Sequence, residues 1–174
     1  MRPLPEGIRV ARAGSADVSR VRALVEAGLR SYREWAPDFV LTHAPPGRVA
    51  QLRALYEGDE AWVLMALEGD EVVGVVSVSP RTAADPEPAP RGTIYLWQMF
   101  VAAAWQGRGL AQALLDLLLD EARRRGYERM TLWAAAGAQQ ARRFYEKEGF
   151  TPTGRTQHDD ALGMDLVQYG IELG

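Results

Sequence analysis

The chain has 174 residues, a length typical of one compact domain, and 47% of them are hydrophobic while 25% are charged. Its formal net charge of -3 argues against a general affinity for nucleic acid, and the lack of cysteine excludes disulfides, thiolate metal sites and a cysteine nucleophile. The His and carboxylate residues lack the spacing of a zinc site, so we expect no metal. No apolar stretch approaches the roughly 20 residues of a membrane span, and residues 1–10 lack a signal-peptide core. We therefore predict one cytoplasmic domain over residues 1–174.

The N-terminal part of the chain predicts one strand and two helices. Residues 8–12 alternate apolar and polar side chains, which is typical of a short strand. Apolar residues at helical spacing from Val18 to Leu29 predict a helix over about residues 17–35, and Pro37 ends it. Pro45 and Pro46 then open a second helix that stops at Gly58.

Two adjacent strands are predicted over residues 61–67 and 71–78. The tripeptide Glu68-Gly69-Asp70 between them favours a tight turn, so we expect an antiparallel hairpin. Residues 80–92 are rich in proline and poor in apolar side chains, which predicts an exposed loop. This loop is either a plain connector or a lid near a site, and both interpretations stay open.

The remainder of the chain predicts a mixed α/β fold. Residues 93–101 are aromatic and β-branched, which is typical of a buried central strand. A glycine-rich turn follows, and then an amphipathic helix over residues 110–125 that Gly126 caps. The later elements are a strand at 128–134, a helix at 139–148, a return strand from Gly149 onward and a last strand at 162–169. This order predicts a mixed central sheet of about 6–7 strands with helices on both faces.

The turn between the central strand and the long helix has the features of an anion site. A helix N-terminus leaves several backbone N–H groups free and carries the positive end of the helix dipole. Gly107 and Gly109 can adopt positive φ, and Arg108 can add a charge-assisted contact. A P-loop is excluded because Leu110 follows Gly109, and a dinucleotide fingerprint is disfavoured because Gln112 stands in place of its third glycine. A turn that binds nothing remains the alternative.

Two motifs resemble those of a known family. The pattern Gln106-x-x-Gly109-x-Ala111 resembles the acetyl-CoA signature of the Gcn5-related N-acetyltransferase (GNAT) family, and residues 141–150 resemble its second signature. The predicted element order is also similar to that fold. The resemblance implies the GNAT acyl-CoA N-acyltransferase fold, with acetyl-CoA as cosubstrate. The cofactor-binding residues that it implies are Met99, Phe100, Val101, Gln106, Gly107, Arg108, Gly109, Leu110, Ala111, Ala141, Phe144 and Tyr145.

The same resemblance implies a catalytic role for Tyr145 as the general acid that protonates the leaving thiolate. Backbone N–H groups of Phe100 or Val101 would polarise the thioester carbonyl, and Arg142 or Arg143 would reach the ribose phosphate. The family often has Asn where this chain has Ala138, so one contact to the pantetheine arm is not expected here. The general base is not assigned, because the strand at 93–101 contains no Asp or Glu. The candidates are a water relay or one of Glu34, Asp38, His43, His158, Asp159 and Asp160.

The amine acceptor remains open at this stage. In this fold the first two helices, their connection and the last strand connection line the acceptor side, which here means Tyr32, Trp35, Phe39 and His43, with residues 157–160 opposite. The predicted substrate-binding residues are Tyr32, Trp35, Gln98 and Asp159. Aromatic rings with carboxylates suit a cationic or aromatic amine, and the alternative is that Trp35 and Phe39 simply close the core. The partner is a small-molecule or peptide amine rather than nucleic acid or a membrane, and a homodimer is one option. The alternative function is a non-catalytic acyl-CoA binding or sensor module on the same fold.

Overall fold

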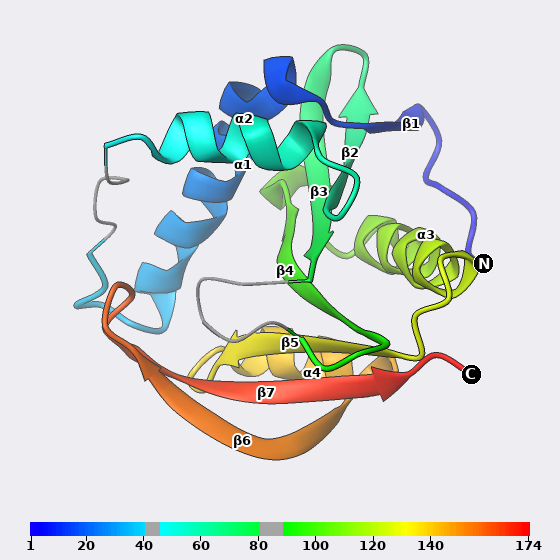
Figure 1. The fold of residues 1–174 in the computed structure, drawn as a ribbon. Coiled ribbons are helices and arrows are strands. Elements are labelled where there is room, and N and C mark those ends of the chain that lie inside the picture. Colours follow the sequence, from blue (N-terminus) through cyan, green and yellow to red (C-terminus); the bar gives the residue numbers. More distant parts are fainter. Residues whose placement is uncertain (41–45, 81–88) are drawn as a thin grey trace.

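The computed structural model describes residues 1–40, 46–80 and 89–174 (Figure 1). The strands are β1 (Ile8–Arg12), β2 (Trp62–Glu68), β3 (Glu71–Ser79), β4 (Thr93–Val101), β5 (Arg129–Ala135), β6 (Thr151–Asp159) and β7 (Met164–Glu172). The α-helices are α1 (Val18–Arg30), α2 (Arg48–Glu57), α3 (Leu110–Arg124) and α4 (Gln139–Lys147). Short 3-10 turns stand at η1 (Ser15–Asp17), η2 (Ser31–Glu34) and η3 (Ala103–Trp105).

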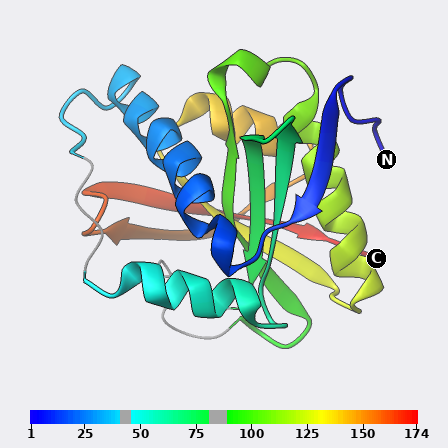
Figure 2. The ribbon, with the colours of Figure 1, turned by 90° about the horizontal axis from the view of Figure 1, so that it is seen from above.

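The strands form a seven-stranded sheet in the order β1-β2-β3-β4-β5-β7-β6. Strands β4 and β5 are parallel, and the other neighbours are antiparallel, including the predicted hairpin of β2 and β3. Helices α1 and α2 pack against one face, while α3 and α4 pack against the other (Figure 2). The predicted mixed sheet with helices on both faces is therefore confirmed.

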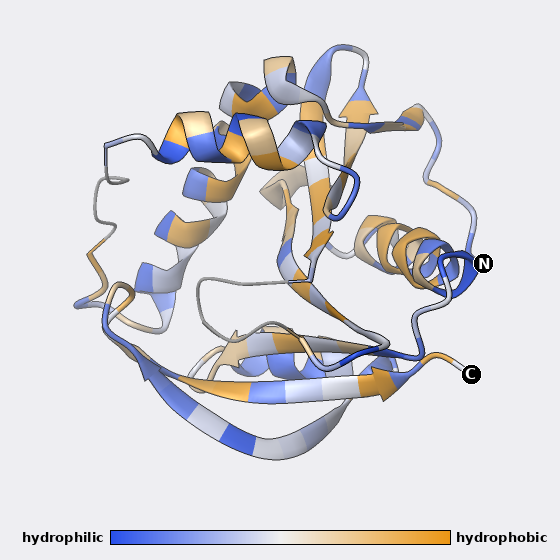
Figure 3. Cartoon of the chain, viewed as in Figure 1, coloured by the Kyte–Doolittle hydropathy of each residue, from blue (hydrophilic) through white to orange (hydrophobic). Residues whose placement is uncertain are grey.

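Each face of the sheet has its own hydrophobic core. On the α3 face, Leu110, Leu114 and Leu118 are fully buried, because their spacing puts them on the stripe of α3 that meets the sheet. Figure 3 shows this apolar stripe on α3 and the polar side turned to solvent. On the α1 face, Val18 and Val21 are fully buried against β2 and β3. These two cores hold β4 between them.

The predicted boundaries that differ most from the structure are the end of the first helix, the start of the second helix and the end of the last strand. The first helix ends at Arg30 and continues as the 3-10 turn η2, in which the Tyr32 carbonyl accepts from the Trp35 and Ala36 amides. The second helix begins at Arg48, because Gly47 with φ of 83° is its N-cap. The last strand extends to Glu172, since its pairing with β5 continues as far as Arg129. Periodicity locates an element better than it locates the element's ends.

Strand β4 separates from β5 halfway along its length. It pairs with β5 only from Thr93 to Leu96, whereas its pairing with β3 continues to Val101. The β3 pairing shifts register at Trp97, so this residue is a β-bulge. A bulge bends its strand, which fits the divergence that begins at this residue. The sheet therefore opens into a V between the second half of β4 and the end of β5.

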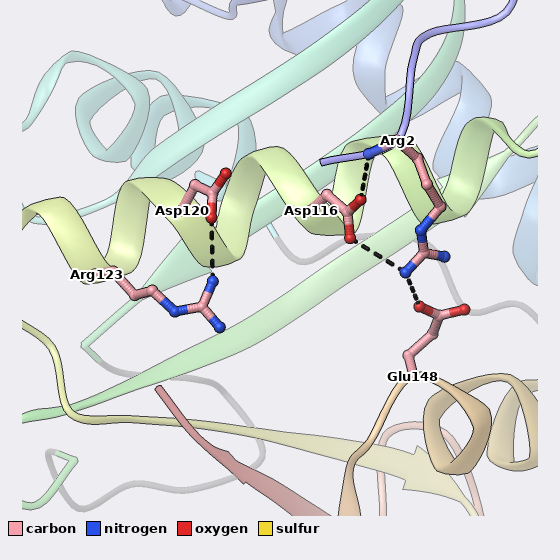
Figure 4. A network of polar contacts seen from close by, with 5 residues as sticks. All are labelled: Arg2, Asp116, Asp120, Arg123 and Glu148. Atoms are coloured by element: carbon pink, nitrogen blue, oxygen red, sulfur yellow. Dashed lines mark hydrogen bonds and ion pairs between the residues drawn. The ribbon is translucent and has the colours of Figure 1, made fainter. Parts of the chain in front are cut away.

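Arg2, in the segment before β1, joins the two helices of the α3 face. Arg2 donates its backbone N–H to Asp116 of α3 at 2.7 Å, and its guanidinium lies 2.5 Å from the Glu148 carboxylate just after α4 (Figure 4). The same guanidinium also contacts Asp116 at 3.2 Å. A nearby pair, Asp120 with Arg123, lies within α3, and Arg123 also donates from Nε to the Leu173 carbonyl at 2.8 Å. Arg2 thus connects α3, which packs on β3, to the end of α4.

Two further properties concern membranes and metals. None of the helices in the described part of the chain is long and apolar enough to cross a membrane. Among those same residues, no group of three or more His, Asp or Glu side chains is arranged to hold a metal ion. The candidate base His43 and most of the 80–92 loop lie outside the described residues, so the lid interpretation stays untested.

Candidate functional site

The glycine turn stands between the open end of β4 and the N-terminus of α3. Gly107 and Gly109 have φ of 73° and 83°, a backbone conformation that residues other than glycine rarely adopt. A Cβ atom built on either glycine meets nothing within 4 Å, so the turn presents bare backbone. Within the described ranges, the amides from Gly107 to Ala111 donate to no backbone carbonyl. Free amides at a helix N-terminus form a concave site for an anion such as a phosphate group.

Three side chains fix the shape of this turn. Gln106 folds back so that its Nε2 donates to the Val101 carbonyl at 3.2 Å, and its backbone N–H donates to Ala103. The indole N–H of Trp105 donates to Glu68 at 3.1 Å, which ties the turn to the β2–β3 hairpin. The Arg108 guanidinium lies 5.1 Å from the centroid of the Trp105 ring. A cation is therefore held beside the free amides.

The second half of β4 is only partly buried, in contrast to its first half. Residues Thr93 to Leu96 are buried, whereas Trp97 to Val101 are partly exposed. Met99 and Val101 contact the core on the α3 face, while Trp97 and Phe100 contact the core on the α1 face. The edge turned away from β3 lacks a strand partner over these last five residues among those described. This edge offers backbone hydrogen bonds to an extended ligand.

A cleft of about 500 Å³ lies between α1 and the end of β4. Its α1 wall consists largely of small residues, among them Ala23, Ala27 and Gly28. Val101 and Gln106 line the opposite wall. The cleft leads from the surface to the point where β4 meets the glycine turn.

Tyr145 lies on α4 and is packed by two rings. The ring centroids of Phe144 and Phe150 are 5.4 Å and 5.7 Å from its own, both in edge-to-face arrangements. Burial raises the pKa of the Tyr145 hydroxyl above its ordinary value, and the nearby Tyr32 adds to the increase. The hydroxyl thus keeps its proton at neutral and moderately alkaline pH, as a general acid must.

The neighbouring arginines of α4 have different surroundings. Arg142 donates from Nε to the Tyr169 hydroxyl at 3.0 Å and from a terminal nitrogen to the Ala136 carbonyl at 3.0 Å. The Tyr169 hydroxyl in turn donates to Glu146 at 2.7 Å. Arg143 is exposed, as is Ala141, and Phe144 is partly buried against the α3-face core. Of the two arginines, Arg143 is the one that can turn toward a phosphate without breaking these bonds.

The residues predicted for the acceptor side do not all lie together. Tyr32 packs against Trp35 at 4.9 Å and against Phe39 at 5.5 Å between ring centroids. Trp35 also touches Gly137 just after β5, where a Cβ atom would lie 3.1 Å from the indole ring. Tyr32 also lies close enough to Tyr145 to raise the pKa of the Tyr145 hydroxyl. Burial raises the pKa of Tyr32 itself.

The two polar candidates on this side have local partners. The Ser77 hydroxyl donates to Oε1 of Gln98 at 3.3 Å. The Asp159 carboxylate accepts from the Leu162 amide at 2.9 Å, so it caps the β6–β7 turn. We therefore place Gln98 next to the V and Asp159 at the tip of the hairpin.

The candidate bases are exposed or engaged. His158 contacts Asp165 at 2.8 Å, and this hydrogen bond raises the pKa of the imidazole above its ordinary value. A raised pKa leaves less neutral imidazole at pH 7 to accept a proton. Glu34 and Asp38 are exposed on and after η2. The geometry favours no one of these candidates, and the base stays unassigned.

Residues that the motifs did not indicate also surround the V. Gln168 is only 4% exposed, and its Oε1 accepts from the Thr153 hydroxyl at 2.9 Å. Trp97 and Trp133 have buried indole N–H groups that lack a partner among the described residues. For Gln168 the sequence did contain a signal, because a glutamine within the apolar run from Leu166 to Tyr169 is unusual. The tryptophans gave none, because aromatic residues are common in buried strands.

Comparisons with known proteins identify relatives of this chain. The model of the acetyltransferase (GNAT) family matches residues 28–150. N-acetyltransferase 8F1 of Rattus norvegicus is 35% identical over 94 residues, which are 54% of this chain and 40% of that protein. The chain spans less than half the length of such curated relatives.

Solved structures share the fold. An N-acetyltransferase from Staphylococcus aureus Mu50 superposes with a TM-score of 0.73 at 21% identity, covering 96% of this chain and 99% of that one. A Salmonella typhimurium protein solved with its cofactor acetyl-CoA gives a TM-score of 0.70 at 23% identity, covering 96% of this chain and 94% of that one.

Proposed function

Because this chain belongs to the acetyltransferase (GNAT) family, we propose that it transfers the acetyl group of acetyl-CoA to a primary amine by direct attack in a ternary complex. The observation that carries the proposal is the junction of two features. Strand β4 leaves β5 after Leu96, and the free end of β4 runs directly into a turn with unpaired amides. One elongated ligand with an anionic section can use both.

The residues of the junction fit the chemistry of acetyl-CoA. The amides from Gly107 to Ala111, with the guanidinium of Arg108, would bind its diphosphate. Backbone groups of Met99, Phe100 and Val101 would pair with the amides of its pantetheine arm as an added strand pairs with a sheet edge. Arg143 would reach the ribose phosphate. A chain with net charge -3 needs such a local site to hold a highly anionic ligand.

The same residues supply most of what acyl transfer needs. The thioester supplies an activated acetyl group, whose carbonyl develops negative charge as the amine attacks. Backbone N–H groups of Phe100 or Val101 would donate to that oxygen. Tyr145, which keeps its proton, would donate it to the departing sulfur. Water would relay the proton from the amine, because β4 has no acidic residue.

Turnover separates this proposal from a non-catalytic acyl-CoA binding module. Free thiol is measured while the protein, acetyl-CoA and a panel of amines are incubated together. Acceptor-dependent release of thiol is expected, and its absence with every amine would leave only the binding module. Relatives include a protein named L-2,4-diaminobutyric acid acetyltransferase, so diamines and amino acids belong in the panel.

Binding is tested separately by thermal shift. A ligand present at about 100 times its Kd adds roughly 2.7 kcal/mol to the free energy of unfolding. A melting temperature that is unchanged by millimolar acetyl-CoA would reject the cofactor site in both versions of the proposal. We further propose that the reaction takes place in the cytoplasm, where a chain without cysteine loses nothing to the reducing conditions.

A further inference from the structure

The cleft between α1 and the end of β4 has no part in the acetyl transfer proposed above. Helix α1 runs beside strands β3 and β4 (Figure 2), and the cleft is bounded by α1, the start of β3 and the segment from Val101 to Gln106. Because Glu71 and Val72 of β3 line it, the cleft lies on the β3 side of β4. The pantetheine arm is proposed for the opposite edge of β4, so this arm leaves the cleft unfilled.

The direction of the backbone amides puts the thioester beside this cleft. The Ala102 amide donates to the Val73 carbonyl of β3 at 2.9 Å. Successive N–H groups of a strand point to opposite edges, so the Val101 N–H is turned to the edge of β4 that has no strand partner among the described residues. Of the two amides suggested for the thioester oxygen, Val101 is therefore the one that can reach it. Val101 also lines the cleft, which puts the acyl carbon next to the cleft.

The walls of the cleft suit a hydrocarbon chain. The α1 wall presents small side chains at Ala23 and Ala27, both exposed, and bare backbone at Gly28. The apolar residues opposite are Val72, Val101 and Ala102. From Arg20 to Gly28 this wall follows eight residues of α1, which is about 12 Å at about 1.5 Å per residue. Carbon–carbon bonds are about 1.5 Å long, so an extended chain of about eight carbons fits along it.

The mouth of the cleft is polar, and its cation is already engaged. The Arg20 guanidinium donates to the Asp17 carboxylate at 3.1 Å and also to the Asp70 carbonyl. The side chains of Asp70 and Glu71 are exposed beside it, and Arg9 approaches the Asp70 carboxylate only to 3.9 Å. A ligand that ended in a carboxylate would thus meet like charges at the mouth and would lose hydration between apolar walls. The cleft therefore favours an uncharged chain.

We propose that the protein also uses acyl-CoA donors with straight, uncharged chains from butyryl to octanoyl, and that the cleft between α1 and the end of β4 holds the chain. The inference rests on the proposed acyl transfer and adds the class of donor. The reaction keeps the same steps. The amine nitrogen bonds to the thioester carbon, the C–S bond breaks, and the sulfur takes a proton from Tyr145. The proton that the amine loses passes through water and restores Tyr145.

The amine acceptor does not compete for this cleft. The aromatic rings predicted for the acceptor side belong to η2, where Tyr32 packs against Trp35. Trp35 lies against Gly137, just after β5, so these rings stand on the β5 side of the V. The cleft is bounded by β3 instead. An acyl chain and an acceptor can therefore approach the thioester carbon from different sides.

The test measures the affinity of the protein for acetyl-, butyryl-, hexanoyl- and octanoyl-CoA by calorimetry, and thiol release with the amine that acetyl-CoA serves best. Kd is expected to fall roughly two- to fourfold for each methylene added up to hexanoyl. Succinyl-CoA matches butyryl-CoA in chain length but ends in a carboxylate, and should bind at least about tenfold more weakly than butyryl-CoA. Affinities that stay equal or fall as the chain grows would overturn the inference and leave acetyl transfer standing. Failure of every acyl-CoA to bind rejects the function and the inference together.

Two variants locate the effect in the cleft. Ala27→Leu puts a larger side chain on the α1 wall at an exposed position, where leucine is nearly as good a helix former as alanine. It is expected to bring the ratio of hexanoyl-CoA to acetyl-CoA affinity close to one, because the chain loses its space. Ala50→Leu makes the same change at an exposed position of α2 and should leave the ratio at its wild-type value. An Ala27→Leu variant that keeps the wild-type ratio, or that weakens all donors equally, contradicts the placement of the chain in this cleft.

Discussion

Phe100 occupies the space that a side chain at Gly28 would need, since a Cβ atom on Gly28 would lie 2.2 Å from Cδ1 of the phenyl ring. Gly28 is in the last turns of α1, and Phe100 is in the half of β4 that has left β5. The lack of a side chain at residue 28 therefore lets α1 approach the part of β4 to which we assign the pantetheine arm.

Gly28→Ala is expected to destabilise the protein by about 1–3 kcal/mol, because the ring must leave its position. The same displacement should weaken acetyl-CoA binding. Urea unfolding and titration with acetyl-CoA measure the two effects. The double variant with Phe100→Leu frees space at the ring edge, so it should recover part of the lost stability. Strictly additive losses in the double variant would show that the two residues do not conflict.

Gly109→Ala tests the glycine turn against a matched position. Gly109 and Gly126 bound the two ends of α3 with φ of 83° and 80°, and neither has a neighbour that a methyl group would strike. Each alanine variant should lose roughly 1–2 kcal/mol from the unfavourable left-handed backbone. Only Gly109→Ala should also weaken acetyl-CoA binding, measured by calorimetry. Equal affinities in the two variants would remove the turn from the cofactor site.

Tyr145→Phe removes the proposed acid and keeps the ring between Phe144 and Phe150. We expect kcat to fall by roughly 10²- to 10⁴-fold, with the affinity for acetyl-CoA little changed. Steady-state thiol release and thermal shift measure these quantities. Tyr127→Phe, at a partly buried ring near Trp62, removes a hydroxyl away from the predicted site and should retain full activity. A Tyr145→Phe variant as active as the wild type would exclude the acid role.

The free energy of unfolding should decline above about pH 10. Burial raises the pKa of Tyr56 to about 12, and it raises the pKa values of Tyr32 and Tyr145 as well. An unfolded tyrosine loses its proton near pH 10, so above this pH the native state holds more protons than the unfolded state and loses stability as pH rises. Below pH 10 the contribution is fully present. Urea unfolding between pH 8 and pH 11.5 checks the trend, and Tyr56→Phe should make it shallower.

Tyr169→Phe should destabilise the protein by about 1–3 kcal/mol, since it leaves Arg142 and Glu146 without their shared partner. The Tyr169 ring is fully buried and its packing is unchanged by the substitution. Urea unfolding provides the measurement. Tyr127→Phe, at a partly buried ring near Trp62, serves as the control. A loss no greater than that of the control would mean that the three-residue network contributes little.

Local pattern was sufficient for much of the fold. The hairpin of β2 and β3 followed from two apolar runs around Glu68-Gly69-Asp70, and the stripe of leucines located α3. The glycine turn was recognised because its spacing is a property of adjacent residues. The pattern misled at η2, where Tyr32 and Trp35 continue the apolar spacing of α1 but pack as a separate aromatic cluster.

The remaining features depend on residues far apart in the chain. Nothing in β4 itself shows that its pairing with β5 ends at Leu96, since this depends on the register of two strands. Arg142 and Arg143 look equivalent in the motif, and only Tyr169, on β7, distinguishes them. The stacking of Arg155 on Trp133 likewise depends on a bulge whose form the sequence around Gly154 does not specify.

The four-pair ladder between β4 and β5 also has a consequence for how the protein opens. It is the sole strand pairing that joins the β1–β4 part of the described sheet to the β5–β7 part, and each part is otherwise paired within itself. Cooperative units of unfolding commonly follow such divisions. In native-state hydrogen exchange we expect the amides of residues 93–96 to exchange through separation of the two parts, at a lower free energy than those in the centre of either part. Arg2 connects α3 with the end of α4 across this seam, so Arg2→Ala should hasten their exchange in particular.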